Sequence, residues 1–150
     1  MKEYSEPRMH TAEHLLNQTM VRMFGRGRAF SSHIERKRSK CDYRFDRDLS
    51  PEEKAELELR VNEAVRADLP VTEEFMSPAE ACKTLDLGRL PPGAAADTVR
   101  VIKIGDYDSC ACIGPHVTST AEIGVFRIIS SSFAEGVLRI RFRLDAPGQT

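Results

Sequence analysis

Long apolar runs are absent from this 150-residue sequence, and none approaches the ~20 residues that a membrane span requires. Residues 1–8 carry charges where a secretory signal peptide needs an apolar stretch. Low-complexity segments are also missing, and 41% apolar with 30% charged residues is the composition of an ordinary globular protein. These absences argue against a membrane protein and a disordered chain. We expect one cytoplasmic domain over residues 1–150.

Cysteine is scarce, with four residues in the whole chain. Because the cytoplasm keeps thiols reduced, these cysteines are expected to be buried thiols or metal ligands and not disulfides. We interpret Cys41, Cys82 and Cys110 as small buried apolar residues. On a regular strand Cys110 would face the same side as Cys112, ~6 to 7 Å away.

Net charge is also small, −1 at pH 7, but it is the sum of two opposed regions. Residues 26–47 hold eight Lys or Arg against three Asp or Glu, and residues 48–80 hold ten acidic residues against three basic ones. Near the end, Arg139, Arg141 and Arg143 alternate with apolar residues, which predicts three cations on one face of a half-buried strand. Such a row attracts phosphates or is simply a solvated strand face.

Three segments begin with helix-start residues, a serine followed at once or two positions later by proline. Apolar residues recur at helical spacing after the first two, and the second and third also place glutamate where a capping box needs it. The first predicted helix starts at Ser5 and Pro7 and ends at Gly25, the second runs from Ser50 to Pro70, and the third runs from Ser77 to about Gly88, with a loop over 91–97.

Strand patterns occur mainly in the second half of the chain. Between the first two helices, β-prone residues predict a hairpin over 28–46. The later strands are predicted at 99–104, in a segment ending at Cys112, at 123–129 and at 137–144. This order predicts an α+β domain in which helices cover one face of an antiparallel sheet and leave its far face available for a ligand.

Two short motifs carry residues that bind metals. His10 and His14 are four positions apart on a predicted helix and can aim both imidazoles at one ion. In Cys112-Ile-Gly-Pro-His116, a turn at Gly114 can bring a thiolate and an imidazole together. Each motif alone is weak, but three of the four histidines fall in these pairs, and the donors suit a borderline-soft ion such as zinc. The ion would tie the first helix to the sheet.

The same motifs resemble one protein family. His10-Thr-Ala-Glu-His-Leu-Leu16, Cys112-Ile-Gly-Pro-His-Val117 and Thr120-Ala-Glu-Ile-Gly124 are similar to the editing domain of alanyl-tRNA synthetase and its freestanding relatives, the AlaX-type deacylases. The resemblance covers nearly the whole chain. It implies the editing-domain fold of the threonyl- and alanyl-tRNA synthetases, and a zinc-dependent hydrolase that cleaves the ester between a wrong amino acid and the terminal adenosine of tRNA. The implied zinc ligands and catalytic centre are His10, His14, Cys112 and His116.

The sequence departs from the family's pattern at a few positions. Ile113 and Pro115 stand where the family usually has a glycine and a threonine, and Gly-Pro-His is more like the threonyl-tRNA synthetase editing domain. Ala121 stands where a glycine is usual, and the chain resembles the short freestanding class. The expected reaction is removal of serine or glycine from tRNA-Ala.

The resemblance also implies roles for other residues. Backbone N–H groups at the Gly114 turn are expected to stabilise the oxyanion, and the amino-acid pocket is expected to include Ser31, Ser32 and His33. Glu13 is expected to be solvated or to support the ligands. The expected partner is the acceptor end of tRNA, and neither a membrane nor DNA is expected. Contacts with tRNA phosphates are assigned to Arg26, Arg28, Arg36, Lys37, Arg38, Arg139, Arg141 and Arg143.

Two other interpretations remain open at this stage. Four protein ligands usually describe a closed structural zinc site, so the chain can be a non-catalytic zinc-containing module that binds tRNA. His-x-x-Glu-His also matches the inverted zinc-peptidase motif, with Glu73 or Glu74 as the third ligand and Glu13 as the base. The peptidase interpretation leaves Cys112 and His116 without a role.

Overall fold

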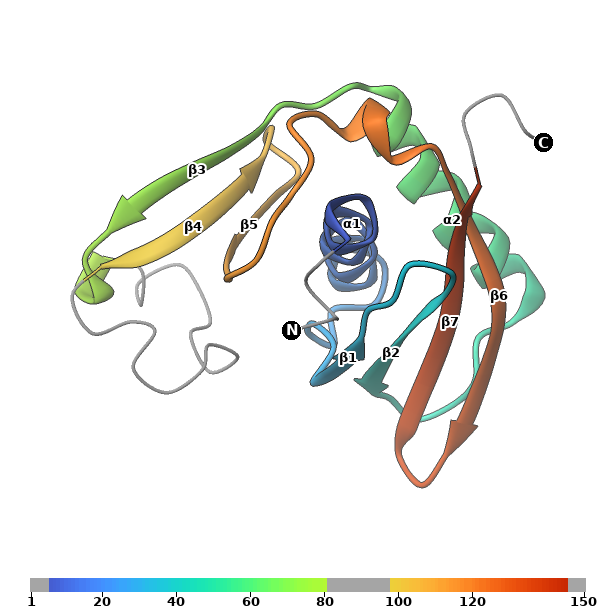
Figure 1. The fold of residues 1–150 in the computed structure, drawn as a ribbon. Helices are drawn as coiled ribbons and strands as arrows, with labels where there is room; N and C mark the ends of the chain where they lie inside the picture. Colours follow the sequence, from blue (N-terminus) through green and yellow to red (C-terminus); the bar gives the residue numbers. More distant parts are fainter. Residues whose placement is uncertain (1–5, 81–97, 146–150) are drawn as a thin grey trace.

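The computed structural model describes residues 6–80 and 98–145. It confirms an α+β fold, drawn in Figure 1. In chain order the elements are α1 (Pro7–Phe24), β1 (Ser31–His33), β2 (Ser39–Arg44), α2 (Pro51–Arg66), β3 (Val71–Met76), β4 (Val99–Ile104), β5 (Asp108–Ala111), the 3-10 helix η2 (Thr120–Ile123), β6 (Val125–Ala134) and β7 (Val137–Asp145).

The first two predicted helices are confirmed, and local chemistry explains their ends. The Glu6 side chain accepts a hydrogen bond from the N–H of Arg8 at the start of α1, and Gly25 ends the helix in the left-handed region at φ 68°. At α2, Ser50 and Glu53 form the predicted capping box. Most of the predicted third helix and all of the loop at 91–97 lie outside the described residues.

The strands form two antiparallel sheets, which corrects the expectation of one sheet. One has four strands in the order β1-β2-β7-β6, and the other has three in the order β3-β4-β5. Between the two sheets the chain leaves β5 and passes through a loop and η2 before it enters β6. The predicted hairpin and later strands are present, whereas β3 was not predicted.

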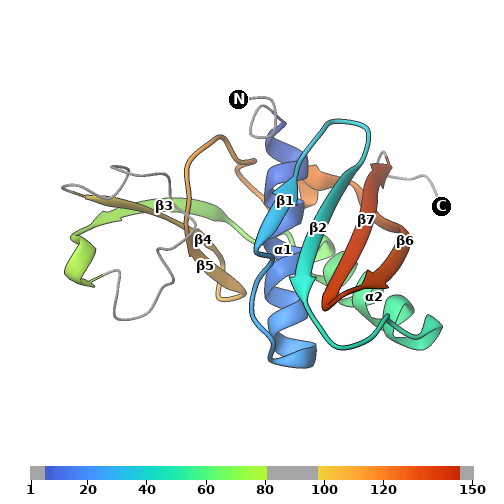
Figure 2. The same cartoon turned by 90° about the horizontal axis from the view of Figure 1, so that it is seen from below.

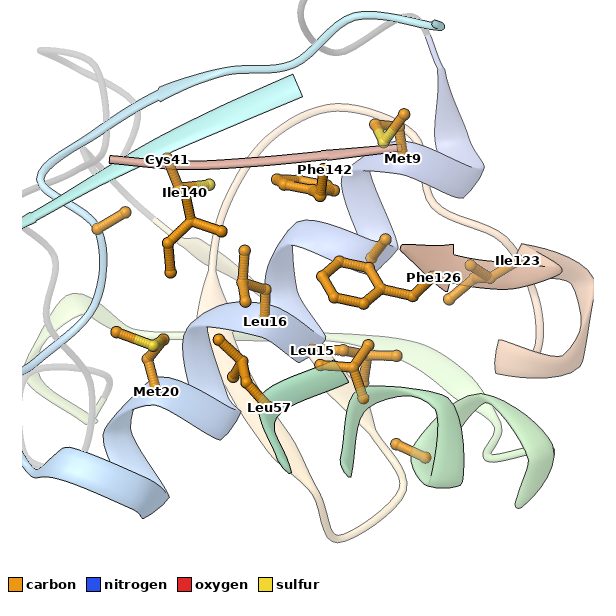
Figure 3. Close-up of a cluster of buried hydrophobic side chains, with 14 of the residues drawn as sticks. Met9, Leu15, Leu16, Met20, Cys41, Leu57, Ile123, Phe126, Ile140 and Phe142 are labelled. Atoms are coloured by element: carbon orange, nitrogen blue, oxygen red, sulfur yellow. The ribbon is translucent and has the colours of Figure 1, made fainter. Parts of the chain in front are cut away.

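Helices α1 and α2 cover one face of the four-stranded sheet, as Figure 2 shows, and α1 lies between the two sheets (Figure 1). The inner face of the sheet supplies Ile140 and Phe142 to the main core, and α1 supplies Leu15 and Leu16 (Figure 3). These core side chains hold one side of α1 against the sheet.

Gly124 is required just before β6, because a Cβ there would lie 2.3 Å from the carbonyl oxygen of Asp145.

The cysteine and arginine expectations have mixed outcomes. Cys41 is fully buried as expected, Cys110 is only half-buried, and Cys82 lies outside the described residues. On β7 the expected alternation is confirmed, since the apolar residues from Leu138 to Phe142 face the core and the arginines face outward.

No helix within residues 6–80 and 98–145 is long and apolar enough to span the bilayer.

Candidate metal centre

The first two turns of α1 bury polar side chains as deeply as apolar ones. His10 is 1% exposed and His14 is 3% exposed, although both lie on the side of the helix away from Leu15 and Leu16. Burying a polar group without a partner costs free energy, so each needs a hydrogen bond or a metal ion. This side of α1 is therefore the place to look for chemistry.

The other part of the site is the loop after β5. Cys112 follows the last residue of β5, and Gly114 turns the chain with a positive φ of 99°. The Arg100 guanidinium donates hydrogen bonds to the carbonyl oxygens of Cys112 (3.3 Å) and Gly114 (2.9 Å). Arg100 thus clamps the turn that brings His116 back beside Cys112.

The two motifs converge in space, as the sequence predicted. One donor atom from each of His10, His14, Cys112 and His116 lies within 4.8 Å of the other three. We call these four residues the His–Cys cluster. Cys112 Sγ and His116 Nε2 are 3.3 Å apart, and adjacent ligand atoms around a tetrahedral zinc would be roughly 3.3 to 3.7 Å apart. The cluster can hold a metal ion.

Hydrogen bonds orient two of the imidazoles toward a common centre. His10 Nδ1 is 3.0 Å from the carbonyl oxygen of Pro115, so this nitrogen carries the proton and donates it. His116 Nδ1 is 2.8 Å from Thr11 Oγ1. In both rings Nε2 is left with its lone pair, which is the form that binds a metal.

Thr11 fixes the direction of the His116 hydrogen bond. Its hydroxyl donates its single proton to the carbonyl oxygen of Pro7 (3.0 Å) and accepts from the N–H of Val117 (3.2 Å). The remaining contact with His116 must therefore be accepted by Oγ1, which requires a proton on Nδ1. One buried threonine sets the tautomer of a candidate ligand.

His14 is supported by a buried carboxylate. Its Nδ1 is 3.4 Å from Asp108 Oδ2, and the Asp108 side chain is fully buried. Arg28 donates to both Asp108 oxygens (2.8 and 3.2 Å), and Gln18 donates to Oδ1 (2.8 Å). Burial by itself would raise the pKa of Asp108, but the contacts with His14 and Arg28 outweigh it and hold that pKa below its usual range. The arrangement matches the carboxylate–histidine pairs that support metal ligands.

Burial sets the protonation state of the donors. It lowers the pKa of His10 to about 4, with a further contribution from His14, and it lowers the pKa of His116 as well. Burial, followed by the effect of Cys110, raises the pKa of the Cys112 thiol to about 12. At neutral pH these two imidazoles are neutral and ready to bind, and a metal ion must displace the thiol proton.

Two expectations about charged residues near the cluster are wrong in part. Glu13 is 3% exposed, so it is not solvated, and the alternative of a supporting carboxylate remains. Arg28, assigned to tRNA phosphates, is instead half-buried and paired with Asp108. Glu13 is buried on α1, and Arg28 is placed by its ion pair with Asp108 at the start of β5. Periodicity along the chain reveals neither contact.

The other predicted site residues lie on elements other than the two segments that build the cluster. Ser31, Ser32 and His33 form β1, the edge strand of the four-stranded sheet, with His33 paired to Glu35. The remaining basic residues assigned to tRNA lie in three places: Arg26 just after α1, Arg36, Lys37 and Arg38 in the turn between β1 and β2, and Arg139, Arg141 and Arg143 on β7.

Both carboxylates of the peptidase interpretation are engaged outside the cluster. Glu73 is paired with Arg100 (2.7 Å) and Glu74 with Lys103 (3.0 Å), and neither belongs to the cluster. Among the described residues, Cys112 and His116 complete the donor set that His10 and His14 begin, and no glutamate belongs to that set.

Three contributors to the site were missed: Thr11, Asp108 and Arg100. Thr11 stands inside the His-Thr-Ala-Glu-His motif, and its position between two candidate ligands was a signal in the sequence. Asp108 precedes Cys112 by four positions and was a carboxylate near a candidate ligand. Arg100 had no such signal, because its contact with the turn depends on the pairing of β4 with β5.

The fold and the site define an α+β domain in which two buried histidines, a half-buried histidine and a half-buried cysteine meet at one point. Residues 99–141 match the model of the threonyl and alanyl tRNA synthetase second additional domain. The chain is 39% identical to the alanine–tRNA ligase of Treponema denticola over 138 residues, which is 91% of the chain and 23% of that enzyme. It is 38% identical to the enzyme of Treponema pallidum over 149 residues (93% and 23%), and 38% identical to that of Coxiella burnetii over 135 residues (89% and 16%).

The chain is thus similar to alanine–tRNA ligases over most of its length, as the motifs predicted, and its residues 99–141 match the second additional domain of threonyl and alanyl tRNA synthetases. It spans about a quarter or less of the length of the curated relatives that it matches.

Proposed function

We propose that this chain is a zinc-dependent aminoacyl-tRNA deacylase that removes serine or glycine from tRNA-Ala in the cytoplasm, acting as one editing domain. The observation that carries the proposal is the convergence of the four His–Cys donors, from two distant segments, within 4.8 Å of one another. Zinc fits this donor set, because neutral imidazoles and a thiolate are its preferred ligands. The similarity to alanine–tRNA ligases over most of the chain supports tRNA as the partner.

When bound, zinc would supply Lewis-acid polarisation of the ester carbonyl or a bound water of lowered pKa. The chain's own residues prepare the site for this chemistry. The Pro115 carbonyl and Thr11 are hydrogen-bonded to His10 and His116, the Asp108 carboxylate lies 3.4 Å from His14 Nδ1, and burial keeps His10 and His116 neutral.

The turn after Cys112 supplies a candidate oxyanion site. Among the described residues, no acceptor pairs with the backbone N–H of Ile113 or Gly114, and Arg100 holds the carbonyl of Gly114 on the other side of the turn. We assign these two N–H groups to the developing negative charge on the ester oxygen. Ser31, Ser32 and His33 keep their assignment to the amino-acid pocket.

Hydrolysis is tested with purified protein and a panel of charged tRNAs. Serine and glycine on tRNA-Ala are the expected substrates, mischarged tRNA-Thr is the alternative, and alanine on tRNA-Ala is the correctly charged control. Amino-acid release is measured before and after the protein is stripped of metal. The proposal requires release of serine or glycine that disappears with the metal; full activity without metal contradicts it.

A second candidate is a non-catalytic zinc module that binds tRNA. Four protein donors favour it, because structural zinc sites are closed by four ligands. The same panel separates the two functions. Retention of metal and tRNA binding, without hydrolysis of any ester, identifies the module.

A further inference from the structure

The outer face of the four-stranded sheet carries charged side chains of β2 and β7. The helices lie behind this sheet (Figure 2). Strand register places His33, Lys40, Arg141 and Ser130 side by side on one level of this face. The next level, two residues along each strand, holds Ser31, Asp42, Arg139 and Ser132. Neighbouring levels on one face are ~7 Å apart.

The two levels differ in how their cations are paired. Arg139 forms a two-pronged ion pair with Asp42, with N···O distances of 2.8 and 2.9 Å. Arg143, one level beyond Arg141, pairs with Asp145 at 3.1 Å. Arg141 lies between these two paired arginines, and its hydrogen bond is a 3.4 Å contact with the hydroxyl of Ser130. Of the three arginines, Arg141 alone has no carboxylate partner among the described residues.

A cavity of about 360 Å³ opens beside Arg141. We call it the sheet-face pocket; it is lined by His33, Glu35, Arg38, Ser39, Lys40 and Arg141. Its side chains carry three cations, and its one carboxylate, Glu35, is already engaged by His33. The turn that contributes Arg38 is held by hydrogen bonds between Ser39 Oγ and the backbone of Glu35 (2.9 and 3.1 Å). The pocket therefore carries a net positive charge, and hydrogen bonds fix the turn at its rim.

A second cavity on the same face provides an internal comparison. It is larger, about 560 Å³, and lined by Phe30, Asp42, Ser132, Ala134, Glu135, Val137 and Arg139. Its one cation is bound to Asp42, and Glu135 adds a second negative charge. The two cavities therefore share a sheet face but have opposite electrostatic character, and only the sheet-face pocket attracts an anion.

We propose that the sheet-face pocket binds a backbone phosphate of RNA, through Arg141, Lys40 and Arg38. Three cations around one cavity suit the charge and oxygen-rich surface of a phosphate, and Arg141 presents a planar fork of donors for it. This inference rests on the proposed function in taking RNA as the partner. Of the three β7 arginines, the proposal assigns phosphate binding to Arg141 alone. The charges of Arg139 and Arg143 are already neutralised by carboxylates.

The test measures binding of fluorescently labelled, uncharged tRNA-Ala by anisotropy over a series of KCl concentrations. Arg141→Ala is expected to weaken binding about threefold to tenfold near 100 mM salt. It should also lower the slope of log affinity against log salt by about 0.7 to 0.9. Arg141→Lys should recover most of the affinity, because it restores the charge. Removal of Lys40 and Arg38 as well should lower the slope by about two to three in all.

The matched control removes the neutral ion pair on the next level, with Asp42→Ala and Arg139→Ala combined. Its net charge equals that of the wild type, so its tRNA affinity should stay within twofold. Thermal melting checks that each variant is folded. Equal binding by Arg141→Ala and wild type at every salt concentration overturns the proposal, and so does a control variant that loses as much affinity as Arg141→Ala.

Inorganic phosphate at constant ionic strength is the second probe. Binding of free phosphate as tight as that of tRNA would make the pocket a small-anion site and overturn the RNA assignment. Uncharged tRNA needs no hydrolysis, so binding lost with Arg141 while no ester is cleaved would refute only the deacylase function. Conversely, ester cleavage with unchanged KM in Arg141→Ala would refute only the phosphate assignment.

Discussion

The two sides of α1 are equally buried but chemically opposite. Leu15 and Leu16 face the main core with no exposed surface (Figure 3), and His10 and His14 face the loop after β5 with at most 3% exposed. Burial of the leucines stabilises the fold directly through the hydrophobic effect. Burial of the imidazoles costs free energy that hydrogen bonds, or a bound ion, must offset. Substitutions on the two sides should therefore separate stability from function.

The largest effect is expected on the polar side. His14→Ala removes one donor from the His–Cys cluster, and a metal ion contributes several kcal/mol to this kind of reaction. Serine release from tRNA-Ala should fall at least about a thousandfold, with loss of bound zinc. Single-turnover kinetics and metal analysis on one preparation measure both quantities. A variant that lacks zinc yet keeps its rate would break the link between cluster and chemistry.

The matching change on the apolar side is Leu16→Ala. The cavity it leaves in the core should lower the free energy of unfolding by about 2 to 5 kcal/mol, as measured by urea denaturation. Folded molecules should still bind one zinc ion and keep their rate per bound metal. A cost below about 1 kcal/mol, or loss of metal from folded protein, would show that the two sides are not independent.

The pH dependence of the metal-free protein tests the polar side alone. Burial, and then His14, lowers the pKa of His10 to about 4 from the ordinary value of 6.5. Between these values the unfolded chain binds more protons at this position, so stability is complete above pH 6.5 and falls as pH drops toward 4. The His10 contribution is on the order of 3 kcal/mol. Urea titrations in the presence of a chelator should show this loss in wild type, and less of it in His10→Gln.

A smaller effect is expected at Asp108, which lies beside His14 but is not one of the four cluster residues. Asp108→Asn keeps the size of the side chain but removes the charge beside His14 Nδ1. Supporting carboxylates of this kind change metal affinity by about 10 to 100-fold, and competition with a chromophoric chelator measures it. Asp46→Asn, in an exposed pair with Arg26, is the control and should leave zinc affinity unchanged. Equal affinities in the two variants would remove Asp108 from the account.

The elements whose signals are local were predicted from the sequence. Both described helices carry their capping residues beside them in the chain, and the hairpin of β1 and β2 is closed by a short turn. Strand β3 was missed because four of its six residues are exposed and show no alternation. The division into two sheets depends on β2 pairing with β7, a contact between distant segments that no local pattern encodes.

In the candidate site, too, residues with a local sequence signal were predicted and residues placed by tertiary packing were not. The four donors were predicted because each pair is close in sequence and has a residue type that binds metals. Asp108 and Arg28 form one ion pair across 80 positions, and the Thr11–His116 contact spans 105. Their roles follow from where α1 packs against β5 and its loop. Sequence patterns identified the donors, and tertiary packing identified what orients them.

Zinc titration of metal-stripped protein, followed by serine release from seryl-tRNA-Ala, tests the central claim most directly. If the His–Cys cluster is the catalytic metal centre, activity returns in proportion to added zinc and stops rising at one equivalent, and the His10→Ala protein stays inactive throughout. Activity that is unaffected by stripping, or that returns equally in His10→Ala, would contradict the account.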